Sequence, residues 1–246
     1  MDVSGNTVFI TGGTSGIGLC LATQLVAAGN EVVVCGRSEE KLAAAAATVE
    51  GLHTIRCDIA DEADVEACLE RLASDFPNLN VLVNNAGVFH LHRFGEGDDA
   101  LDLAVQEMTV NYFGTLRLIK RMLPRLSERP RAAIVNVTSG LAYIPFAAAP
   151  TYSATKAALH SFTQSLRHQL KDSSVQIFEV LPPVVDTPMT RDLEGIPKMP
   201  PDKVAAGIIK GLRKGKPEIP IGISKALRAM RRLAPGTVFK ALNKGR

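Results

Sequence analysis

Short runs of β-branched and aliphatic residues alternate with longer segments of helical periodicity along most of the chain. Some of the short runs, such as Glu31–Cys35 and Val81–Asn84, are nearly continuous in Val and Leu, as expected for strands that are buried on both faces of a parallel sheet. The seven predicted strands are Thr7–Ile10, Glu31–Cys35, Thr54–Cys57, Val81–Asn84, Ala133–Thr138, Val175–Leu181 and Glu218–Ile221. Helical segments are predicted between them at Ile17–Ala28, Glu39–Val49, Ala63–Asp75, Asp99–Arg125, Tyr152–Leu170 and Asp202–Arg213. This alternation predicts right-handed crossovers and one α/β domain on a doubly wound parallel sheet, which binds ligands at the carboxyl ends of its strands.

The composition is that of an ordinary globular protein, since 46% of the 246 residues are hydrophobic and 22% are charged. No apolar run approaches the roughly 18 residues of a membrane-spanning helix. Residues 1–5 show no basic segment followed by an apolar one, so we expect no secretory signal and a cytoplasmic location. The four cysteines are scattered without a CxxC pair, which favours reduced thiols. His90 and His92 have no third ligand nearby in the sequence, and we expect no metal site.

A glycine-rich turn follows the first predicted strand directly and leads into a helix. Its residues are Gly12, Gly13, Thr14, Ser15, Gly16, Ile17 and Gly18. Glycines at positions 12, 16 and 18 permit a tight turn, a close approach of the backbone to a pyrophosphate, and close packing of the helix on the strand. The N-terminus of that helix presents unpaired N–H groups and a partial positive charge to such an anion. A strand before the turn and a helix after it favour a dinucleotide site over a plain structural turn.

The spacing of this turn, T-G-x-x-x-G-x-G, resembles that of the compact members of the short-chain dehydrogenase/reductase superfamily. Further motifs of that family occur in order along nearly the whole chain: Asn84-Asn85-Ala86-Gly87, Asn111, Ser139, Tyr152-x-x-x-Lys156 and Pro182–Thr187. The resemblance implies a three-layer Rossmann fold with a seven-stranded parallel sheet, and a nicotinamide dinucleotide that also contacts Asn85, Ala86 and Gly87. It further implies an oxidoreductase acting on a small-molecule carbonyl or alcohol, and assembly into homo-oligomers. The segment Glu179–Thr187 resembles a bacterial branch of the family named after an oxidoreductase of the D-alanylation operon.

The end of the second predicted strand bears on which dinucleotide is held. NAD-binding folds usually place an acidic residue there, which accepts hydrogen bonds from the ribose hydroxyls. In this chain Gly36 takes that place and Arg37 follows it, so a ribose 2′-phosphate meets no carboxylate and can pair with a guanidinium. We therefore predict NADP(H) in preference to NAD(H), with Ser38 as a further donor; alternatively, Arg37 is a solvated charge beside two glutamates. The family resemblance adds Asp58 and Ile59 at the adenine, and Val185 and Thr187 at the carboxamide.

Tyr152 and Lys156 are four residues apart on a predicted helix, so their side chains share one face. A free tyrosine has a pKa of about 10 and is a poor base near neutral pH. A neighbouring ammonium favours the phenolate and is expected to lower that pKa. Ser139, at the end of a predicted strand, can donate a hydrogen bond to a substrate carbonyl oxygen. From the family resemblance, Tyr152 would exchange a proton with the reacting oxygen, Lys156 would also hold the nicotinamide ribose, and Asn111 would support a water on the proton path.

The segment Pro188–Pro201, where many relatives carry a helical substrate lid, is short and rich in proline. It suggests either an open site for a bulky or loosely selected substrate, or a site that another subunit or a membrane surface covers. The residues near the expected pocket, for each of which core packing is an equal alternative, are Phe89, His90, Tyr143, Phe146, Val184 and Met189. The pair Pro182-Pro183 stands where the family usually has Pro-Gly, and the second proline is expected to stiffen this loop.

The C-terminal segment 224–246 differs from the rest of the chain in charge. The chain has 28 Lys and Arg against 25 Asp and Glu. Seven of these bases and none of the acids lie in 224–246, so residues 1–223 carry a formal net charge of −4. Ile223, Leu227, Met230 and Leu233 recur at helical spacing, which predicts an amphipathic basic helix that breaks near Pro235. We expect an oxidoreductase domain over residues 1–222 and an extension over 223–246 that docks on the body, packs in a subunit interface, or attaches to an anionic membrane surface.

Neither a nucleic-acid-binding motif nor interleaved aromatic residues accompany the basic extension, and we expect no nucleic-acid partner. The leading hypothesis is an NADP(H)-dependent oxidoreductase that interconverts a carbonyl and a secondary alcohol, with Tyr152 as general acid/base. The alternative hypothesis is a nucleotide-binding regulator of the same fold that does not turn over. Such regulators typically lack the tyrosine or the lysine, and this chain has both. The enzyme is therefore favoured.

Overall fold

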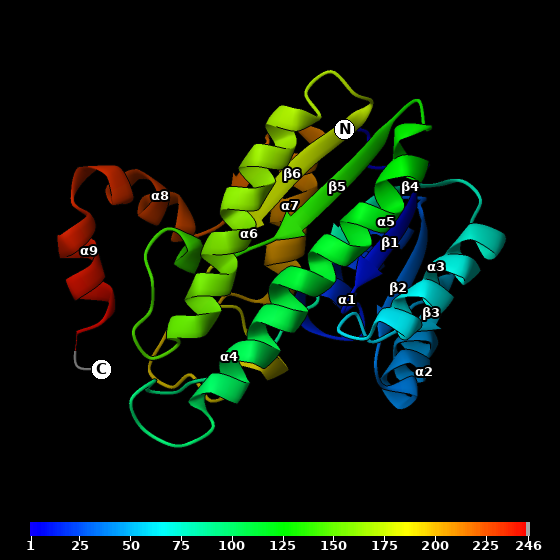
Figure 1. The fold of residues 1–246 in the computed structure, drawn as a ribbon. Coiled ribbons are helices and arrows are strands. Elements are labelled where there is room, and N and C mark those ends of the chain that lie inside the picture. Colours follow the sequence, from blue (N-terminus) through cyan, green and yellow to red (C-terminus); the bar gives the residue numbers. More distant parts are fainter. Residues whose placement is uncertain (245–246) are drawn as a thin grey trace.

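The computed structural model describes residues 1–244 and has three layers, a central sheet with helices on both faces (Figure 1). The strands are β1 (Thr7–Thr11), β2 (Glu31–Gly36), β3 (Leu52–Arg56), β4 (Leu79–Asn84), β5 (Ala132–Val137), β6 (Val175–Leu181) and β7 (Glu218–Pro220). Their order in the sheet is β3-β2-β1-β4-β5-β6-β7, and every neighbouring pair is parallel. The predicted doubly wound Rossmann fold with seven parallel strands is thus confirmed.

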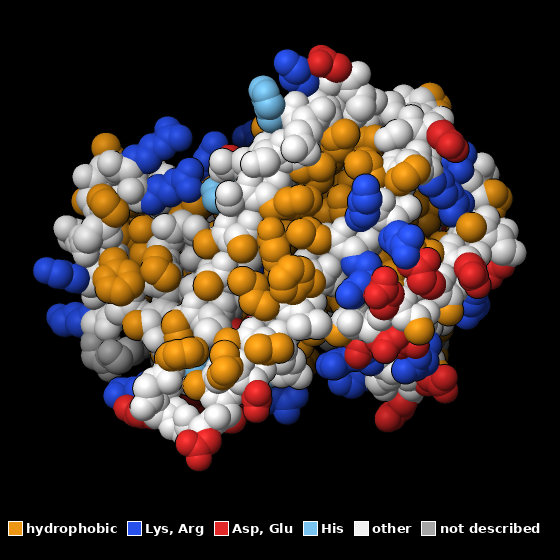
Figure 2. Space-filling model, in the orientation of Figure 1, with side chains coloured by type: hydrophobic (Ala, Val, Ile, Leu, Met, Phe, Trp, Pro, Cys, Tyr) orange, Lys and Arg blue, Asp and Glu red, His pale blue; other side chains and the backbone are white. Residues whose placement is uncertain are grey.

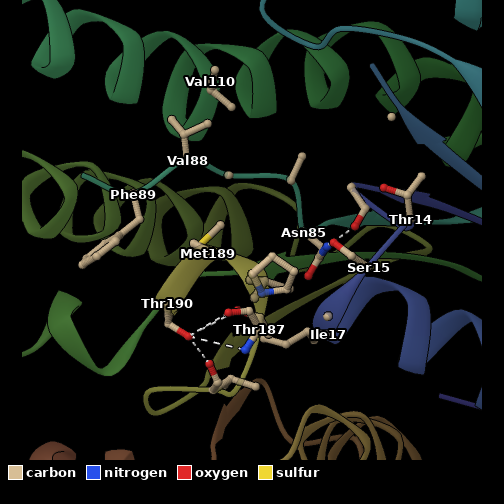
Figure 3. A pocket seen from close by; sticks show the side chains of 18 of the residues that line it. Thr14, Ser15, Ile17, Asn85, Val88, Phe89, Val110, Thr187, Met189 and Thr190 are labelled. Atoms are coloured by element: carbon tan, nitrogen blue, oxygen red, sulfur yellow. Dashed lines mark hydrogen bonds between the residues drawn. The ribbon is translucent and has the colours of Figure 1, made fainter. Parts of the chain in front are cut away.

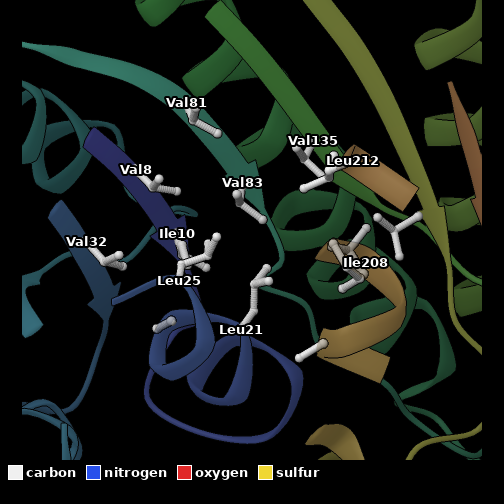
Figure 4. Close-up of a cluster of buried hydrophobic side chains, with 14 of the residues drawn as sticks. Val8, Ile10, Leu21, Leu25, Val32, Val81, Val83, Val135, Ile208 and Leu212 are labelled. Carbon is white, nitrogen blue, oxygen red and sulfur yellow. The ribbon is translucent and has the colours of Figure 1, made fainter. Parts of the chain in front are cut away.

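Two hydrophobic cores, one on each face of the sheet, hold the helices in place. The helices of the two layers are α1 (Gly16–Ala27), α2 (Glu39–Thr48), α3 (Glu62–Asp75), α4 (Ala100–Met108), α5 (Thr115–Ser127), α6 (Pro150–Gln169) and α7 (Pro201–Arg213). Because side chains alternate across a strand, Val8 and Ile10 of β1 pack with α1, α2 and α7 (Figure 4), whereas Phe9 packs with α3, α5 and α6. Among residues 1–244, no helix is long and apolar enough to cross a membrane.

The order of the strands in the sheet determines where a ligand-binding crevice can form. From β1 the chain winds outward to β2 and β3, and from β4 it winds outward in the opposite direction to β7. The connections that leave neighbouring β1 and β4 therefore diverge, and in such sheets a ligand crevice lies outside the carboxyl ends of these strands. The polar segments that follow β1, β4 and β5 all begin at this edge of the sheet.

The helix predicted over Asp99–Arg125 is interrupted. A π-helical segment, Thr109–Gly114, lies between α4 and α5. Gly114 in this segment approaches the chain after β3 closely, since a Cβ there would stand 2.8 Å from the carbonyl oxygen of Ile59. Asn111 lies on the same segment. This predicted site residue therefore occupies an irregular part of the helix, where π-helical turns often coincide with functional sites.

Two short helices, α8 (Ser224–Leu233) and α9 (Pro235–Leu242), form the C-terminal end at the left edge of Figure 1. Pro235 is the first residue of α9, so the helix breaks where predicted. Of the predicted apolar stripe only Leu227 is buried; the side chains of Ile223, Met230 and Leu233 are 64%, 38% and 84% exposed. Docking on the body therefore takes up one residue of the stripe and leaves three exposed. Arg246, which belongs to the predicted basic extension, lies outside the described residues.

Candidate active site

A cavity of about 590 Å³ opens at the carboxyl ends of β1, β2, β4, β5 and β6 (Figure 3). It brings together most of the residues that the motifs single out. Those that line it are Gly12, Thr14, Ser15, Gly16, Ile17, Arg37, Ser38, Asp58, Ile59, Asn85, Ala86, Gly87, Ser139, Tyr152, Lys156, Val185 and Thr187. Gly18 and Asn111 are not among the lining residues and contact the segments that line it.

The glycine-rich turn is packed so tightly that a Cβ at any of its four glycines would stand less than 3.0 Å from a neighbouring atom. Gly12 has φ +65°, and a Cβ there would stand 2.8 Å from the Cα of Ala86; at Gly18 a Cβ would stand 2.4 Å from the carbonyl oxygen of Gly12. The Asn85 side chain holds the turn by donating hydrogen bonds to the carbonyl oxygens of Thr11 and Gly12, each at 3.0 Å. The turn is thus a fixed cradle at the start of α1, whose N-terminal N–H groups suit a phosphate.

The end of the cavity near β2 carries a cation and no carboxylate at the strand end. Gly36 is the last residue of β2. The Arg37 guanidinium lies 4.0 Å from a carboxylate oxygen of Asp58, and 60% of the Arg37 side chain is exposed. The Ser38 hydroxyl caps α2 by accepting the N–H of Lys41 at 3.3 Å, which leaves its own proton free to be donated. These donors suit a phosphate group, which would compete with Asp58 for Arg37.

The opposite end of the cavity holds Ser139, which follows the end of β5, and Tyr152 and Lys156, which lie on α6. The Ser139 side chain lies near the Tyr152 phenol and acts to lower its pKa. The Nζ atom of Lys156 lies 5.6 Å from the centroid of the Tyr152 ring and donates a hydrogen bond to the carbonyl oxygen of Val137 at 3.0 Å. The lysine therefore lies over the ring, and the serine lies near the phenolic group.

Burial controls the ionisation of the tyrosine and the lysine. Burial and the Glu107 carboxylate raise the pKa of Tyr152 above its ordinary value, against the smaller effect of the Ser139 hydrogen bond, which lowers it. Burial lowers the pKa of Lys156 to about 8, although Glu107 opposes this shift. The predicted lowering of the tyrosine pKa is therefore wrong for this structure, because a spacing of four residues predicts a shared helix face and not the degree of burial. Tyr152 is a neutral phenol near pH 7.

Glu107 of α4 is fully buried beside this group, although no motif pointed to it. Its carboxylate accepts hydrogen bonds from the N–H of His90, at 2.8 Å, and from the hydroxyl of Thr151. It thereby ties the segment after β4 to the start of α6, one residue before Tyr152. The signal in the sequence is its position four residues before Asn111, which predicts that both side chains lie on one face of the helix.

Asn111 is also fully buried, and its side chain holds the backbone after β4. Its side-chain oxygen accepts the N–H of Val88 at 2.8 Å, and its amide donates to the Val88 carbonyl oxygen at 2.9 Å and to the Thr155 hydroxyl at 3.2 Å. A Cβ at Gly87 would stand 3.1 Å from the Asn111 side-chain oxygen and 3.7 Å from the Nζ of Lys156. The side-chain oxygen of Asn111 and the Nζ of Lys156 therefore both approach the side of Gly87 on which a Cβ would stand.

The cavity wall beside Tyr152 is partly apolar. Phe89 and Met189 line the cavity (Figure 3), and so does His90. The Phe89 ring meets the Tyr152 ring edge-on, with centroids 4.9 Å apart. The other expected pocket residues belong to neighbouring hydrophobic clusters: Tyr143, Phe146 and Val184. Between β6 and α7 the structure has one short helix, Pro188–Thr190, which Thr187 caps. The segment that follows β6 therefore forms no long lid over the cavity.

Residues 6–195, which contain the glycine-rich turn and the Ser139, Tyr152 and Lys156 group, match the family model described as short chain dehydrogenase. The chain belongs to this family. It is 43% identical, over 99% of its length and 98% of the other, to the uncharacterized oxidoreductase DltE of Bacillus subtilis. This likeness confirms the predicted resemblance to the D-alanylation-operon branch. A relative called fatty acyl-CoA reductase, from Acinetobacter baylyi, is 30% identical over 87% of this chain and 75% of its own.

Solved short-chain dehydrogenases share the fold of this one over almost its whole length. A structure from Burkholderia cenocepacia, described as a complex with NADP, superposes with a TM-score of 0.87 and 28% identity over 98% of this chain and 99% of that chain. A structure from Burkholderia phymatum, described as a complex with NAD, has a TM-score of 0.85 and 21% identity over 100% and 98% of the two chains. This short-chain dehydrogenase is therefore an oxidoreductase whose cavity lies at the crevice of a Rossmann fold.

Proposed function

We propose that this short-chain dehydrogenase interconverts a carbonyl and a secondary alcohol with NADP(H) as its dinucleotide. One observation carries the proposal: a single cavity has a glycine-rich phosphate cradle at one end and Ser139, Tyr152 and buried Lys156 at the other. The residues suit a dinucleotide, because the α1 N-terminus can meet a pyrophosphate and Arg37 can meet a 2′-phosphate where Gly36 presents no acid. The NADP complex described for a relative that is 28% identical supports the same dinucleotide here.

The residues at the two ends divide the binding and the chemistry. We assign the pyrophosphate to the turn Gly12–Gly18, the adenosine phosphate to Arg37 and Ser38, and the nicotinamide half to Lys156, Val185 and Thr187. When bound in its reduced form, the dinucleotide supplies the hydride that the carbonyl carbon accepts. Ser139 donates a hydrogen bond to the carbonyl oxygen and stabilises the negative charge that develops there.

Tyr152 supplies the proton. Because burial and Glu107 raise its pKa, Tyr152 is protonated near pH 7 and donates its phenolic proton to the oxygen that gains negative charge. Lys156, over the tyrosine ring, stabilises the phenolate that remains. Asn111 holds the neighbouring backbone by its hydrogen bonds to Val88. We assign it the support of a water through which Tyr152 regains a proton from solvent. In the direction of alcohol oxidation each proton transfer runs in reverse.

Tyr152→Phe tests this function because it removes only the phenolic oxygen. We expect the variant to fold, to bind NADPH as measured by fluorescence of the bound dinucleotide, and to lose roughly 10²–10⁴-fold of its turnover. The assay is NADPH oxidation against a carbonyl panel that includes fatty aldehydes, sugars and ketosteroids. Tyr112→Phe is the matched control, since the Tyr112 ring contacts Phe113 and Phe162 and does not line the cavity.

Two results would overturn the proposal. Full turnover by Tyr152→Phe would remove the tyrosine from the reaction. Tight NADPH binding by the wild type without oxidation on any member of the panel would favour the nucleotide-binding regulator instead.

We also infer that the protein assembles into a homo-oligomer. The side chains of Leu101, Val105 and Phe113, on α4 and the π-helical segment, are 64%, 57% and 54% exposed. Figure 2 shows hydrophobic side chains gathered over the region of α4, α5 and α6. A contiguous apolar surface of this kind usually marks a protein interface. Light scattering should give more than one chain per particle, and Val105→Lys should reduce that number; a monomeric wild type contradicts the inference.

A further inference from the structure

The C-terminal extension, residues 223–246, leaves part of the apolar stripe of α8 uncovered. The inner face is anchored, because Leu227 is buried in a cluster with Tyr143 and Leu181. The rest of the stripe is not covered, since Ile223 and Leu233 are 64% and 84% exposed. A helix that has already docked therefore presents the uncovered remainder of its apolar stripe, the outer stripe, and exposed apolar stripes of this kind mark binding surfaces.

Basic side chains surround this outer stripe. Two of them contact the body: Arg228 pairs with Glu218 at 3.0 Å, and the Arg231 guanidinium lies 4.3 Å from the centroid of the Tyr143 ring. The remaining bases of α8, α9 and the residues just after them, which together we call the hairpin, are exposed and form no ion pair within residues 1–244: Lys225, Arg232, Lys240 and Lys244. Residues 224–246 contain no acidic residue, whereas residues 1–223 carry a formal net charge of −4. The positive charge of the hairpin is thus free to meet an anionic surface.

The hairpin of α8 and α9 is held firmly enough to act as a unit. It projects from one edge of the molecule, with Lys and Arg side chains around it and hydrophobic side chains between them (Figures 1 and 2). The Asn243 side chain, just after α9, accepts the N–H of Ala147 at 2.6 Å and donates to the carbonyl oxygen of Pro145 at 3.2 Å. The Phe239 side chain on α9 is 41% exposed and enlarges the apolar surface.

We propose that the outer side of the α8–α9 hairpin docks on the surface of a bilayer that contains anionic phospholipids. Leu233 and Phe239 enter the headgroup region, while Lys225 and Arg232 lie among the phosphates, which is the division of roles in interfacial amphipathic helices. A second copy of the chain is a poorer occupant, because a symmetric contact would bring the same basic surface of two hairpins together. Charge complementarity selects the anionic bilayer.

The docked hairpin adjoins the wall of the cavity near Tyr152. Leu242 of α9 packs against the buried cluster of Phe146, Ala149 and Leu193, against which Phe89, Tyr152 and Val184 also pack. An amphiphilic carbonyl compound could then reach the cavity from the membrane. This consequence rests on the proposed function, whereas the docking itself does not.

The test is sedimentation of the full-length protein with phosphatidylcholine vesicles, with and without phosphatidylglycerol. We expect binding only to the phosphatidylglycerol vesicles and less binding as salt is added, because salt screens exposed charges. The double variant Lys225→Glu/Arg232→Glu should lower the partition coefficient by more than about tenfold, since each base near an anionic surface contributes about fivefold. Leu233→Ser should also lower it, although its charge is unchanged. Lys171→Glu, an exposed base outside the hairpin, is the control and should bind like the wild type.

NADPH binding by each variant separates docking from the proposed function, because none of these substitutions lies in the cavity. Three results would overturn the proposal: no sedimentation with phosphatidylglycerol at low salt, equal binding by the hairpin variants and the control, or loss of oligomers in Leu233→Ser with no vesicle binding by the wild type. The last result would assign the stripe to a contact between subunits.

Discussion

A change of charge at the end of β2 should shift the cofactor preference. In the wild type, Gly36 and Arg37 line the cavity and offer a 2′-phosphate a guanidinium without a carboxylate. Arg37→Ala removes the guanidinium, and Arg37→Asp replaces it with a negative charge that repels a phosphate. Gly36→Asp restores an acid at the strand end; a Cβ there would stand 3.0 Å from the Thr14 methyl carbon, so that side chain must shift by a few tenths of an ångström.

The expected size of the effect follows from the exposure of Arg37. A hydrogen bond to a charged group contributes about 1.5–3 kcal/mol, but 60% of this side chain is exposed, and the guanidinium must also leave Asp58 at 4.0 Å. Solvent screening reduces the contribution of exposed charges. We therefore expect Arg37→Ala to weaken NADPH binding by roughly ten- to thirtyfold, which corresponds to about 1.4–2 kcal/mol. NADH binding should change little, and Arg37→Asp should have a larger effect on NADPH.

The measurement is kcat/KM for NADPH and for NADH with the same carbonyl substrate, together with the Kd of each dinucleotide from fluorescence titration. Arg71→Ala is the matched control, because the Arg71 side chain is 59% exposed and does not line the cavity. Equal use of both dinucleotides by the wild type would refute the argument. So would an unchanged NADPH-to-NADH ratio in Arg37→Ala, because Arg37 would then be a solvated charge.

Three further predictions concern packing and ionisation. Gly18→Ala places a Cβ 2.4 Å from the Gly12 carbonyl oxygen and should cost about 1–3 kcal/mol, measured as a fall in Tm of roughly 2–10 °C; Gly236→Ala, with nothing within 4 Å, should leave Tm unchanged. Glu107→Gln removes a carboxylate that raises the pKa of Tyr152, so the pH at which carbonyl reduction declines should fall; an unaltered pH–rate profile of kcat would contradict this. The pKa of Lys156 is about 8 in the folded protein against an ordinary value of 10.5, so the unfolded chain binds more protons between these pH values. The free energy of unfolding from urea titrations should therefore rise with pH in that window, and less so in Lys156→Met.

Much of the fold could be read from local patterns. The alternation of aliphatic runs with helical periodicity predicted all seven strands, and each lies within a few residues of its predicted bounds. Such patterns succeed because burial on both faces requires apolar residues at every strand position. The prediction of one helix over Asp99–Arg125 was wrong in one respect, because Thr109–Gly114 is π-helical. In this segment Gly114 closely approaches Ile59, a contact between distant parts of the chain that local patterns do not show.

The candidate site was predictable in its residues and not in its electrostatics. The glycine-rich turn and the Tyr152-x-x-x-Lys156 spacing are short-range patterns, so they could be recognised without the fold. The raised pKa of Tyr152 could not, because it arises from burial and from Glu107 on another helix. Glu107 itself carried only a weak signal, since its role depends on the meeting of α4 with the start of α6.

The C-terminal end shows the same division. Its positive charge, its helical periodicity and the break at Pro235 are properties of the sequence alone. Which side of α8 would be buried was decided by the tertiary structure, because Leu227 faces a cluster built from the segment after β5 and the last residue of β6. Periodicity predicts that Ile223, Leu227 and Leu233 share a stripe, but only the shape of the surface beneath determines how many of them it can cover. The body covers Leu227 and leaves the other two exposed.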